Sequence, residues 1–209
     1  MPTTIVLVDD HPIVLDGLEQ LLSSSPEFQV IARCATAAEG LSAAQSLNPD
    51  VVVLDLSLPD QNGLSVLRTL QSAPRPAVVV LTASHDEEEL LAAVRLGARG
   101  VVLKAMAPRV LEDCIRTVHA GGRWLRVEGV DLSERLAHRQ EVEAELSAFL
   151  TPRELEILGL AAAGLDNDEI AGRLAISVGT TKIHLHHVYD KLKLNGRREL
   201  QQFLTARQY

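Results

Sequence analysis

Residues 51–63, VVVLDLSLPDQNG, decide the fold class of this chain. The apolar run VVVL leads directly to Asp55, and Pro59 and Gly63 follow in a stretch with the composition of a turn. A short strand that is apolar on both faces is typical of a parallel sheet covered by helices on two sides. In such open sheets ligands bind at the carboxyl ends of the strands. The segment therefore predicts an α/β fold with a functional carboxylate at the sheet edge.

Strand-like runs and helix-like patterns alternate on both sides of this segment. Further strands are predicted at 3–8, 28–34, 76–82 and 100–104, and helices at 12–24, 37–47, 63–72, 86–96 and 108–120. Five such strand–helix units predict a doubly wound, five-stranded parallel sheet in the flavodoxin-like order. We assign this domain to residues 1–124.

The pattern changes after residue 124. Residues 125–149 are rich in charge and carry apolar side chains at roughly helical spacing, which predicts a helical linker. This helix is either a solvated connector or an element that forms a dimer or packs between domains. Residues 150–209 predict an all-α domain of four helices. Its expected N-caps are Thr151, in a capping box with Glu154, then Asp166 and Ser177.

Bulk composition excludes several classes of protein. The 209 residues carry a net charge of −8, contain no apolar run long enough to cross a bilayer, and begin without the features of a signal peptide. Cys34 and Cys114 are isolated, and we interpret them as reduced core residues of a cytoplasmic protein rather than as a disulfide. Net negative charge disfavours nucleic-acid binding, but residues 178–209 hold six basic and two acidic side chains. The positive charge is therefore concentrated at the end of the chain.

Five residues at four predicted strand ends form a candidate site, which we call the acidic pocket: Asp9, Asp10, Asp55, Thr82 and Lys104. Parallel strands bring these ends to one edge of the sheet. Clustered carboxylates are costly unless a cation neutralises them, and oxygen ligands suit Mg²⁺. A carboxylate beside Mg²⁺ can attack a phosphoryl donor, while a lysine and a threonine hold the phosphoryl oxygens. The pocket therefore predicts phosphoryl transfer to a carboxylate.

Residues 5–120 resemble a CheY-like receiver domain. The resemblance is carried by four motifs: IVLVDDH (5–11), VVVLDLSLPDQNG (51–63), VVVLTA (78–83) and GARGVVLK (97–104). It implies that Asp55 accepts a phosphoryl group from a histidine kinase, and that Thr82 and Lys104 contact that group. It also implies Mg²⁺ ligands at Asp10, at Asp9 mainly through a water, at Asp55, and at the backbone carbonyl of Ser57.

One position departs from the receiver pattern. Receivers usually carry Tyr or Phe three residues before the lysine, and that ring turns inward when the threonine moves toward the phosphate. Here the position is Val101, whose small β-branched side chain has no comparable swing. The sequence therefore predicts phosphorylation but leaves its relay open.

Two other functions compete with this interpretation. A Mg²⁺-dependent phosphohydrolase of the haloacid-dehalogenase type also uses an aspartyl nucleophile, but it carries a second Asp two residues later, where this chain has Ser57. We therefore expect no enzyme activity. A DNA-binding regulator that is not phosphorylated would use the receiver only for dimerisation or ligand binding. Val101 favours this alternative, and the complete acidic pocket argues against it.

Residues 166–193 contain two short predicted helices separated by Ala175-Ile176-Ser177, which indicates a helix-turn-helix. Ile183, Val188 and Leu192 supply apolar positions suited to packing the second helix. The sequence from LTPRELEILGL onward resembles, over residues 150–204, the LuxR-type helix-turn-helix of NarL/FixJ response regulators.

This second resemblance implies binding in the major groove of double-stranded DNA by Lys182, Ile183 and His186. It implies contacts to the DNA backbone by three further residues: Thr180, Lys191 and Asn167. His186 stands where many relatives have Lys or Arg, which weakens the electrostatic attraction to DNA. Thr181 stands where Val is usual, and we expect its hydroxyl to bond back to a helix carbonyl.

The two resemblances together identify the chain as a member of the two-component response regulators. They imply a transcription regulator whose DNA binding depends on phosphorylation of Asp55. Small helix-turn-helix modules bind paired half-sites as dimers, so we also expect a homodimer.

Overall fold

The computed structural model describes residues 1–71 and 76–207. The chain packs into two compact units, Met1–Arg135 and Leu136–Tyr209. In the first unit, strands and helices alternate in the order β1 Thr3–Val8, α1 Pro12–Ser23, β2 Phe28–Cys34, α2 Ala37–Leu47, β3 Val51–Asp55, α3 Gly63–Leu70, β4 Ala77–Thr82, α4 Glu87–Arg95, β5 Gly100–Leu103 and α5 Ala107–His119. A single 3₁₀ turn, Lys104–Met106, joins β5 to α5. The predicted alternation is confirmed; residue 72, the predicted end of α3, lies outside the described residues.

The five strands form one parallel sheet in the order β2-β1-β3-β4-β5, which is the predicted flavodoxin-like order. The register aligns the carboxyl ends of the strands. Val8 pairs with Leu54, Asp55 with Leu81, and Thr82 with Leu103. The residues at or just beyond these pairs therefore meet at one edge of the sheet.

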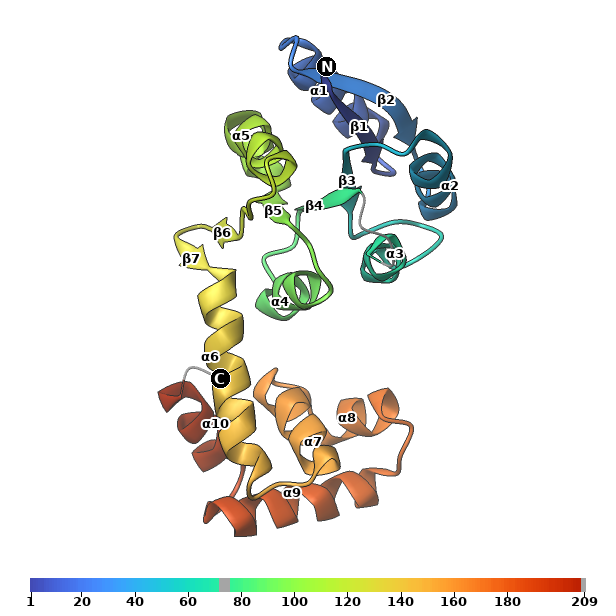
Figure 1. Ribbon diagram of the computed structural model, residues 1–209. Coiled ribbons are helices and arrows are strands. Elements are labelled where there is room, and N and C mark those ends of the chain that lie inside the picture. The colour runs from blue at the N-terminus through green and yellow to red at the C-terminus, as the bar shows by residue number, and fades with distance from the viewer. Residues whose placement is uncertain (72–75, 208–209) are drawn as a thin grey trace. The chain divides into compact units, whose positions relative to one another are not determined.

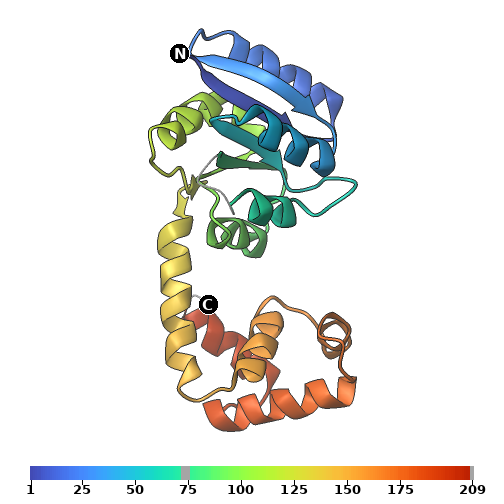
Figure 2. The same ribbon diagram turned by 45° about the vertical axis from the view of Figure 1, so that its right-hand side comes forward.

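Helices cover both faces of this sheet (Figures 1 and 2). Helices α1 and α5 bury one face, where Leu18, Leu22, Leu111 and Ile115 pack on the strands. Helices α2, α3 and α4 follow one another across the opposite face (Figure 2). Strand β3 is buried along its whole length, because both of its faces meet helices.

The segment predicted as a helical linker, residues 125–149, is helical only from Leu132 on. Two short antiparallel strands come first, β6 Arg126–Val127 and β7 Val130–Asp131, and helix α6 follows over Leu132–Ser147. The turn between the strands has Glu128 at φ 49° and Gly129 at φ 88°, the backbone of a two-residue hairpin turn. The sequence signal of this turn is the single Gly129, and the helical spacing of the leucines that follow favoured a continuous helix instead.

The second unit is all helical, as predicted. Besides the part of α6 from Leu136 on, it contains the four predicted helices, α7 Pro152–Ala162, α8 Asn167–Arg173, α9 Val178–Leu192 and α10 Arg197–Ala206. Val142, Leu146 and Leu150 are buried in the same core as Ile157 and Val188. The last part of α6 is therefore part of the core of the C-terminal domain, and this core begins before residue 150.

All three predicted N-caps are confirmed. Thr151 forms the capping box with Glu154, Asp166 forms a second one with Glu169, and the Ser177 side chain accepts a hydrogen bond from the amide of Thr180. Cys34 and Cys114 are free and buried. Within residues 1–71 and 76–207, no helix is both long and apolar enough to span a membrane.

Candidate functional site

The acidic pocket lies where β1, β3, β4 and β5 end. Asp9 and Asp55 are each only 1% exposed, and Thr82 is fully buried. The Lys104 ammonium bridges the two carboxylates, with Nζ 2.7 Å from Asp9 Oδ2 and 2.8 Å from Asp55 Oδ2. The structure therefore brings together the strand-end residues that the sequence predicted as one site.

Lys104 supplies the positive charge that these buried carboxylates need. Burial opposes the charged form of its ammonium, but hydrogen bonds from it to Asp55 and Asp9 outweigh this and raise the pKa of Lys104. An ammonium that stays charged and lies 2.8 Å from Asp55 is placed to contact a phosphoryl group formed on that carboxylate.

The turn after β3 fixes the position of the Asp55 carboxylate. The amide of Ser57 donates to Asp55 Oδ1 at 3.2 Å. At Gly63 a Cβ atom would lie 2.4 Å from the Cα of Leu56 and 2.6 Å from the carbonyl oxygen of Asp55, so only glycine lets α3 start this close to the strand end. The carbonyl of Ser57 as a metal ligand stays a prediction.

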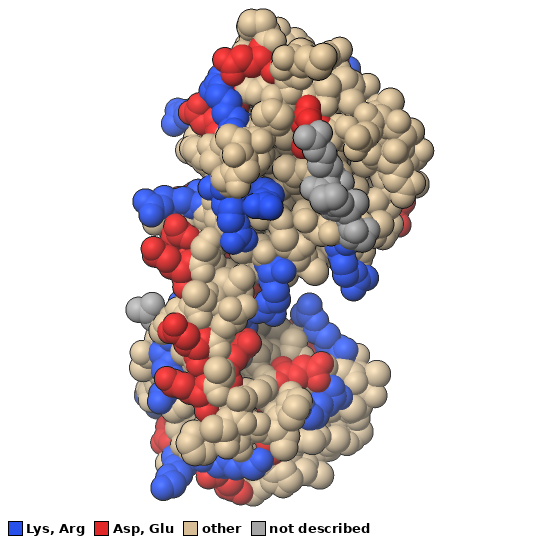
Figure 3. Space-filling view, viewed as in Figure 1, with Lys and Arg blue, Asp and Glu red and all other residues tan. Residues whose placement is uncertain are grey.

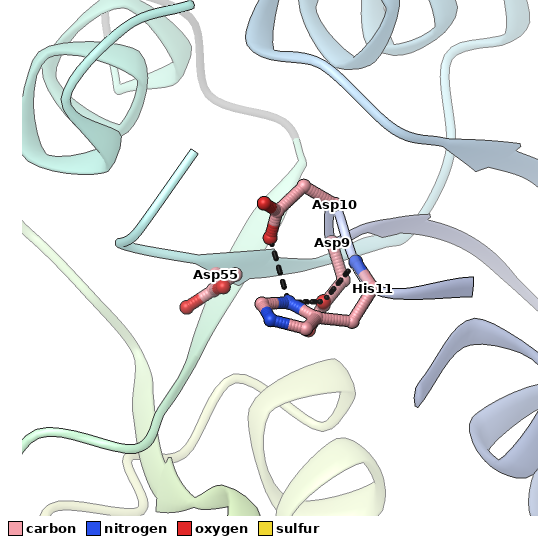
Figure 4. Close-up of side chains that lie close together, drawn as sticks. All are labelled: Asp9, Asp10, His11 and Asp55. Carbon is pink, nitrogen blue, oxygen red and sulfur yellow. Dashed lines mark hydrogen bonds and ion pairs between the residues drawn. The ribbon is translucent and has the colours of Figure 1, made fainter. Parts of the chain in front are cut away.

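The donor set at the pocket fits a divalent cation. Ligand atoms of Asp9, Asp10, His11 and Asp55 all lie within 4.8 Å of one another (Figure 4). Two buried oxygens of the set, Asp9 Oδ2 and Asp10 Oδ1, are contacted only by cationic or ionisable nitrogens, Lys104 Nζ at 2.7 Å and His11 Nδ1 at 2.7 Å, and no backbone amide holds them among the described residues. A bound cation would replace these nitrogens as the partner of the oxygens, and carboxylate oxygens are the ligand type that Mg²⁺ prefers.

His11 belongs to this cluster as well, although none of the roles predicted from the sequence falls to it. Its Nδ1 lies 2.7 Å from Asp10 Oδ1 and 3.2 Å from Asp9 Oδ1, and its amide donates to Asp9 Oδ1 at 2.9 Å. Figure 4 shows the imidazole between the two aspartates. The signal was present in the sequence, because His11 directly follows the strand-end pair Asp9-Asp10.

The second candidate site is the exposed face of α9. Thr181, Leu185 and Val188 are buried against the domain core, so the opposite side of the helix faces outward. Ile183 is 57% exposed, and Lys182 and His186 are exposed beside it. The expectation that Ile183 packs inside is wrong, whereas the three residues expected to face DNA do share the outer face.

The residues expected at the DNA backbone lie in different surroundings. Thr180 is partly exposed near the start of α9, and its hydroxyl contacts that of Ser177 at 2.8 Å. The side-chain oxygen of Asn167 accepts a hydrogen bond from Arg197 at 3.3 Å. Lys191 Nζ forms an ion pair with Glu154 at 2.6 Å, so this ammonium already has a buried partner. Figure 3 shows positive and negative side chains interspersed over the face in view.

Comparison with known proteins covers both units. Residues 5–116 match the family described as response regulator receiver domain, and residues 148–204 match that described as bacterial regulatory proteins, luxR family. The chain belongs to the response regulators.

Two relatives and one solved structure illustrate the likeness. This response regulator is 39% identical over 204 residues to the nitrate/nitrite response regulator protein NarL of Escherichia coli (strain K12), covering 95% of this chain and 93% of that one. It is 34% identical over 206 residues to the oxygen regulatory protein NreC of Staphylococcus aureus (strain MRSA252), covering 95% of each. The response regulator RcsB in complex with DNA has a TM-score of 0.65 and 25% identity, covering 98% of each chain.

The class of the protein follows from these matches. It is a NarL-like two-component response regulator with a receiver and a LuxR-type DNA-binding domain, consistent with phosphorylation-dependent regulation of transcription. Receiver domains generally bind Mg²⁺ at an acidic pocket, and the cluster around Asp55 has the residues for this.

The response regulator also contains a residue near the pocket that sequence reasoning missed. Asp60, in the turn after β3, accepts hydrogen bonds from the amides of Ala37 and Ala38 at 2.8 and 3.1 Å. These bonds, the one from Ala37 above all, lower the pKa of Asp60, and they tie the turn after Asp55 to the start of α2. Because Asp60 and the start of α2 are far apart in the sequence, no local sequence pattern predicts this link.

Proposed function

We propose that this response regulator accepts a phosphoryl group on Asp55 from a histidine kinase, with Mg²⁺ in the acidic pocket, and that this controls its binding to DNA. The observation that carries the proposal is the Lys104 ammonium held 2.7 Å from Asp9 and 2.8 Å from Asp55, both almost fully buried. An ion pair that only stabilises the fold needs one carboxylate, whereas Lys104 binds two, as a residue of a phosphoryl-binding site would.

Different residues of the pocket would bind the metal, attack the phosphorus and hold the phosphoryl oxygens. Asp9, Asp10, Asp55 and the carbonyl of Ser57 would hold Mg²⁺, which when bound neutralises charge on the transferring phosphoryl group. One carboxylate oxygen of Asp55 attacks the phosphorus, and the donor group leaves on the opposite side. Lys104 and the Thr82 hydroxyl then hold the new phosphoryl oxygens.

The experiment is intact-mass measurement after incubation with Mg²⁺ and a small phosphodonor such as phosphoramidate. We expect the mass of one added phosphoryl group on the wild-type chain and none on Asp55→Asn, which keeps the shape but lacks the nucleophile. Equal labelling of both proteins, or no labelling of the wild type, would overturn the proposal.

On the DNA side, the proposed partner is double-stranded DNA bound in the major groove by α9. The supporting observation is that Lys182, Ile183 and His186 share an exposed face next to the helix N-terminus. Thr180, Lys191 and Asn167 are proposed as contacts to the DNA backbone, with Lys191 leaving or sharing its bond to Glu154. We place the working protein in the cytoplasm, where bacterial DNA is, as a homodimer.

The chain is proposed to be a regulator and not an enzyme. Ser57, in the turn after Asp55, has no carboxyl group to act as the general acid that phosphohydrolases place there. Steady turnover of a chromogenic phosphate ester that Asp55→Asn abolishes would contradict this. The alternative regulator that is not phosphorylated is favoured only by Val101, and the labelling experiment above decides it.

A further inference from the structure

The edge of the sheet beside Val101 is covered by the segment that leads to α6. Past α5 the chain returns alongside β5, where the amide of Trp124 donates to the carbonyl of Arg99 at 2.8 Å. The amide of Val101 in turn donates to the carbonyl of Trp124 at 2.9 Å. Residue 124 therefore extends the parallel sheet by one backbone pairing, and the β6–β7 hairpin follows directly.

This segment is anchored on both sides of the hairpin. Leu125 and Leu132 are buried, and the amide of Leu132 donates to the carbonyl of Leu125 at 2.9 Å. Helix α6 therefore starts from a fixed point on the receiver. Beside Val101 lies a cavity of about 100 Å³, walled on one side by Val101, Met106 and Val110 and on the other by Trp124, Val127 and Glu128. The hairpin thus borders the space next to the residue that replaces the usual aromatic.

A chain of hydrogen bonds leads from the pocket into the loop before α4. The Thr82 hydroxyl accepts from the amide of Ser84 at 3.0 Å, and the Ser84 hydroxyl accepts from the amide of Asp86 at 3.1 Å. Asp86 in turn caps α4 by accepting from the amide of Glu88 at 3.1 Å. The loop conformation is therefore built on the present position of the Thr82 hydroxyl.

The same loop contacts the covering segment at two points. His85 Nδ1 lies 3.3 Å from Glu128 Oε2 in the hairpin turn. Glu87, in the first turn of α4, forms an ion pair with Arg135 in the first turn of α6. Both contacts join the segment after Thr82, at His85 and Glu87, to the hairpin turn and the first turn of α6.

We infer that residues 124–135 read the position of Thr82 and pass the state of Asp55 to helix α6, in place of a turning aromatic ring. The inference rests on the proposed phosphorylation of Asp55. A phosphoryl group offers the Thr82 hydroxyl a stronger, charged acceptor. When the hydroxyl moves to it, the Ser84 amide loses its partner, the loop rearranges, and the contacts to Glu128 and Arg135 are released. The hairpin and the first turn of α6 then open more often.

Exposed ion pairs are individually weak, so the expected change is modest. Coupling between two sites in proteins is commonly on the order of fivefold or more in an equilibrium constant. We therefore expect opening of residues 124–135 to become several-fold more frequent on phosphorylation, without unfolding of the receiver.

Trp124 is the only tryptophan of the chain and lies within this segment, so it is a built-in reporter. The experiment uses the full chain with Mg²⁺ and beryllofluoride, an analogue of the phosphoryl group, and measures Trp124 emission and hydrogen exchange by mass spectrometry. We expect an emission shift and several-fold faster exchange in residues 126–135, neither of which occurs in Asp55→Asn.

The two possible failures are distinguishable, because phosphoryl uptake is measured separately by intact mass. A chain that is phosphorylated but shows unchanged emission and exchange overturns the relay and leaves the proposed function standing. A chain that takes up no phosphoryl group overturns the proposed function and the relay with it.

A pair of isosteric substitutions tests the two contacts themselves. The double variant Glu87→Gln/Glu128→Gln removes one carboxylate from each of these two contacts, between α4 and α6 and between the loop and the hairpin turn, and we expect faster exchange in residues 126–135 before beryllofluoride is added. The matched control Glu89→Gln/Glu134→Gln removes two charges from α4 and α6 that form no ion pair with another described residue. Both variants should be phosphorylated normally. Equal behaviour of the two, or fast exchange in neither, would contradict the assigned contacts.

Discussion

Glu154 shows how one side chain joins two helices of the DNA-binding domain. It is only 3% exposed, and its carboxylate accepts hydrogen bonds from the backbone and hydroxyl of Thr151 and from Lys191 of α9. Burial opposes its ionisation, but the bond from Lys191 and those from Thr151 outweigh it and lower the pKa of Glu154 from 4.5 to about 2. The carboxylate therefore contributes to the stability of the domain wherever it is ionised.

Glu154→Gln removes the negative charge but keeps the helix cap, because glutamine can also complete a capping box. The variant therefore tests the contribution of the charge alone. A carboxyl whose pKa is lower in the folded state stabilises above its unfolded pKa and loses this contribution as pH falls from about 4.5 toward 2. We expect the variant to lose roughly 2 kcal/mol at pH 7, and the deficit to shrink by roughly 1 kcal/mol at pH 4. Hydrogen-exchange protection of α7 and α9 in the full chain measures both.

A control on the same helix shows whether burial matters. Glu156 pairs with Arg153 at 2.6 Å but is exposed, so Glu156→Gln should cost under about 1 kcal/mol. A deficit in Glu154→Gln that is the same at both pH values would show that shape, and not charge, explains the loss.

Individual site residues were predictable where local sequence sets their position. Asp9, Asp55, Thr82 and Lys104 lie at or directly after the ends of apolar strands, and parallel pairing alone brings strand ends together. The partner of Lys191 was not predictable, because Glu154 lies in another helix and reaches α9 only through the packing of the domain.

At the scale of elements, caps and apolar periods predicted most boundaries within one or two residues. The hydroxyl of Thr181 does bond back to the carbonyl of Ser177, at 3.3 Å, as its buried position on α9 predicted. The β6–β7 hairpin was missed, because its strands are two residues long and give no measurable alternation. The residue just before it, Trp124, pairs with β5, and this tertiary contact is not encoded in the local sequence.

Helix α9 should read DNA mainly through Lys182, which is exposed on its first turns. If Lys182 contacts a base edge, Lys182→Ala weakens binding to a preferred duplex by about 1–3 kcal/mol. Such a duplex is obtained by selection from a random pool, and affinity is measured by gel-shift titration against it and a scrambled duplex. The loss should be confined to the preferred duplex; equal weakening on both would make Lys182 a backbone contact, and unchanged affinity would remove it from the interface.

At the scale of the whole molecule, charge makes a single copy a poor DNA ligand. The chain carries a net charge of −8, and only a short part of it, residues 178–209 with six basic and two acidic side chains, offers DNA a local excess of positive charge. A second copy on a neighbouring half-site adds its contacts at a high effective concentration, so pairing raises affinity without any new contact. Control of pairing by Asp55 would therefore control DNA binding.

We accordingly expect the full chain loaded with Mg²⁺ and beryllofluoride to select paired half-sites from a random pool, centred about one helical turn apart. Light scattering after size-exclusion chromatography should show two chains per selected duplex, and the Asp55→Asn chain should bind the same duplex on the order of tenfold more weakly. Selection of a single isolated half-site by one chain would refute the dimer. Equal affinity of Asp55→Asn would show instead that pairing proceeds without phosphorylation, because both proteins present the same α9 face and differ only at the acidic pocket.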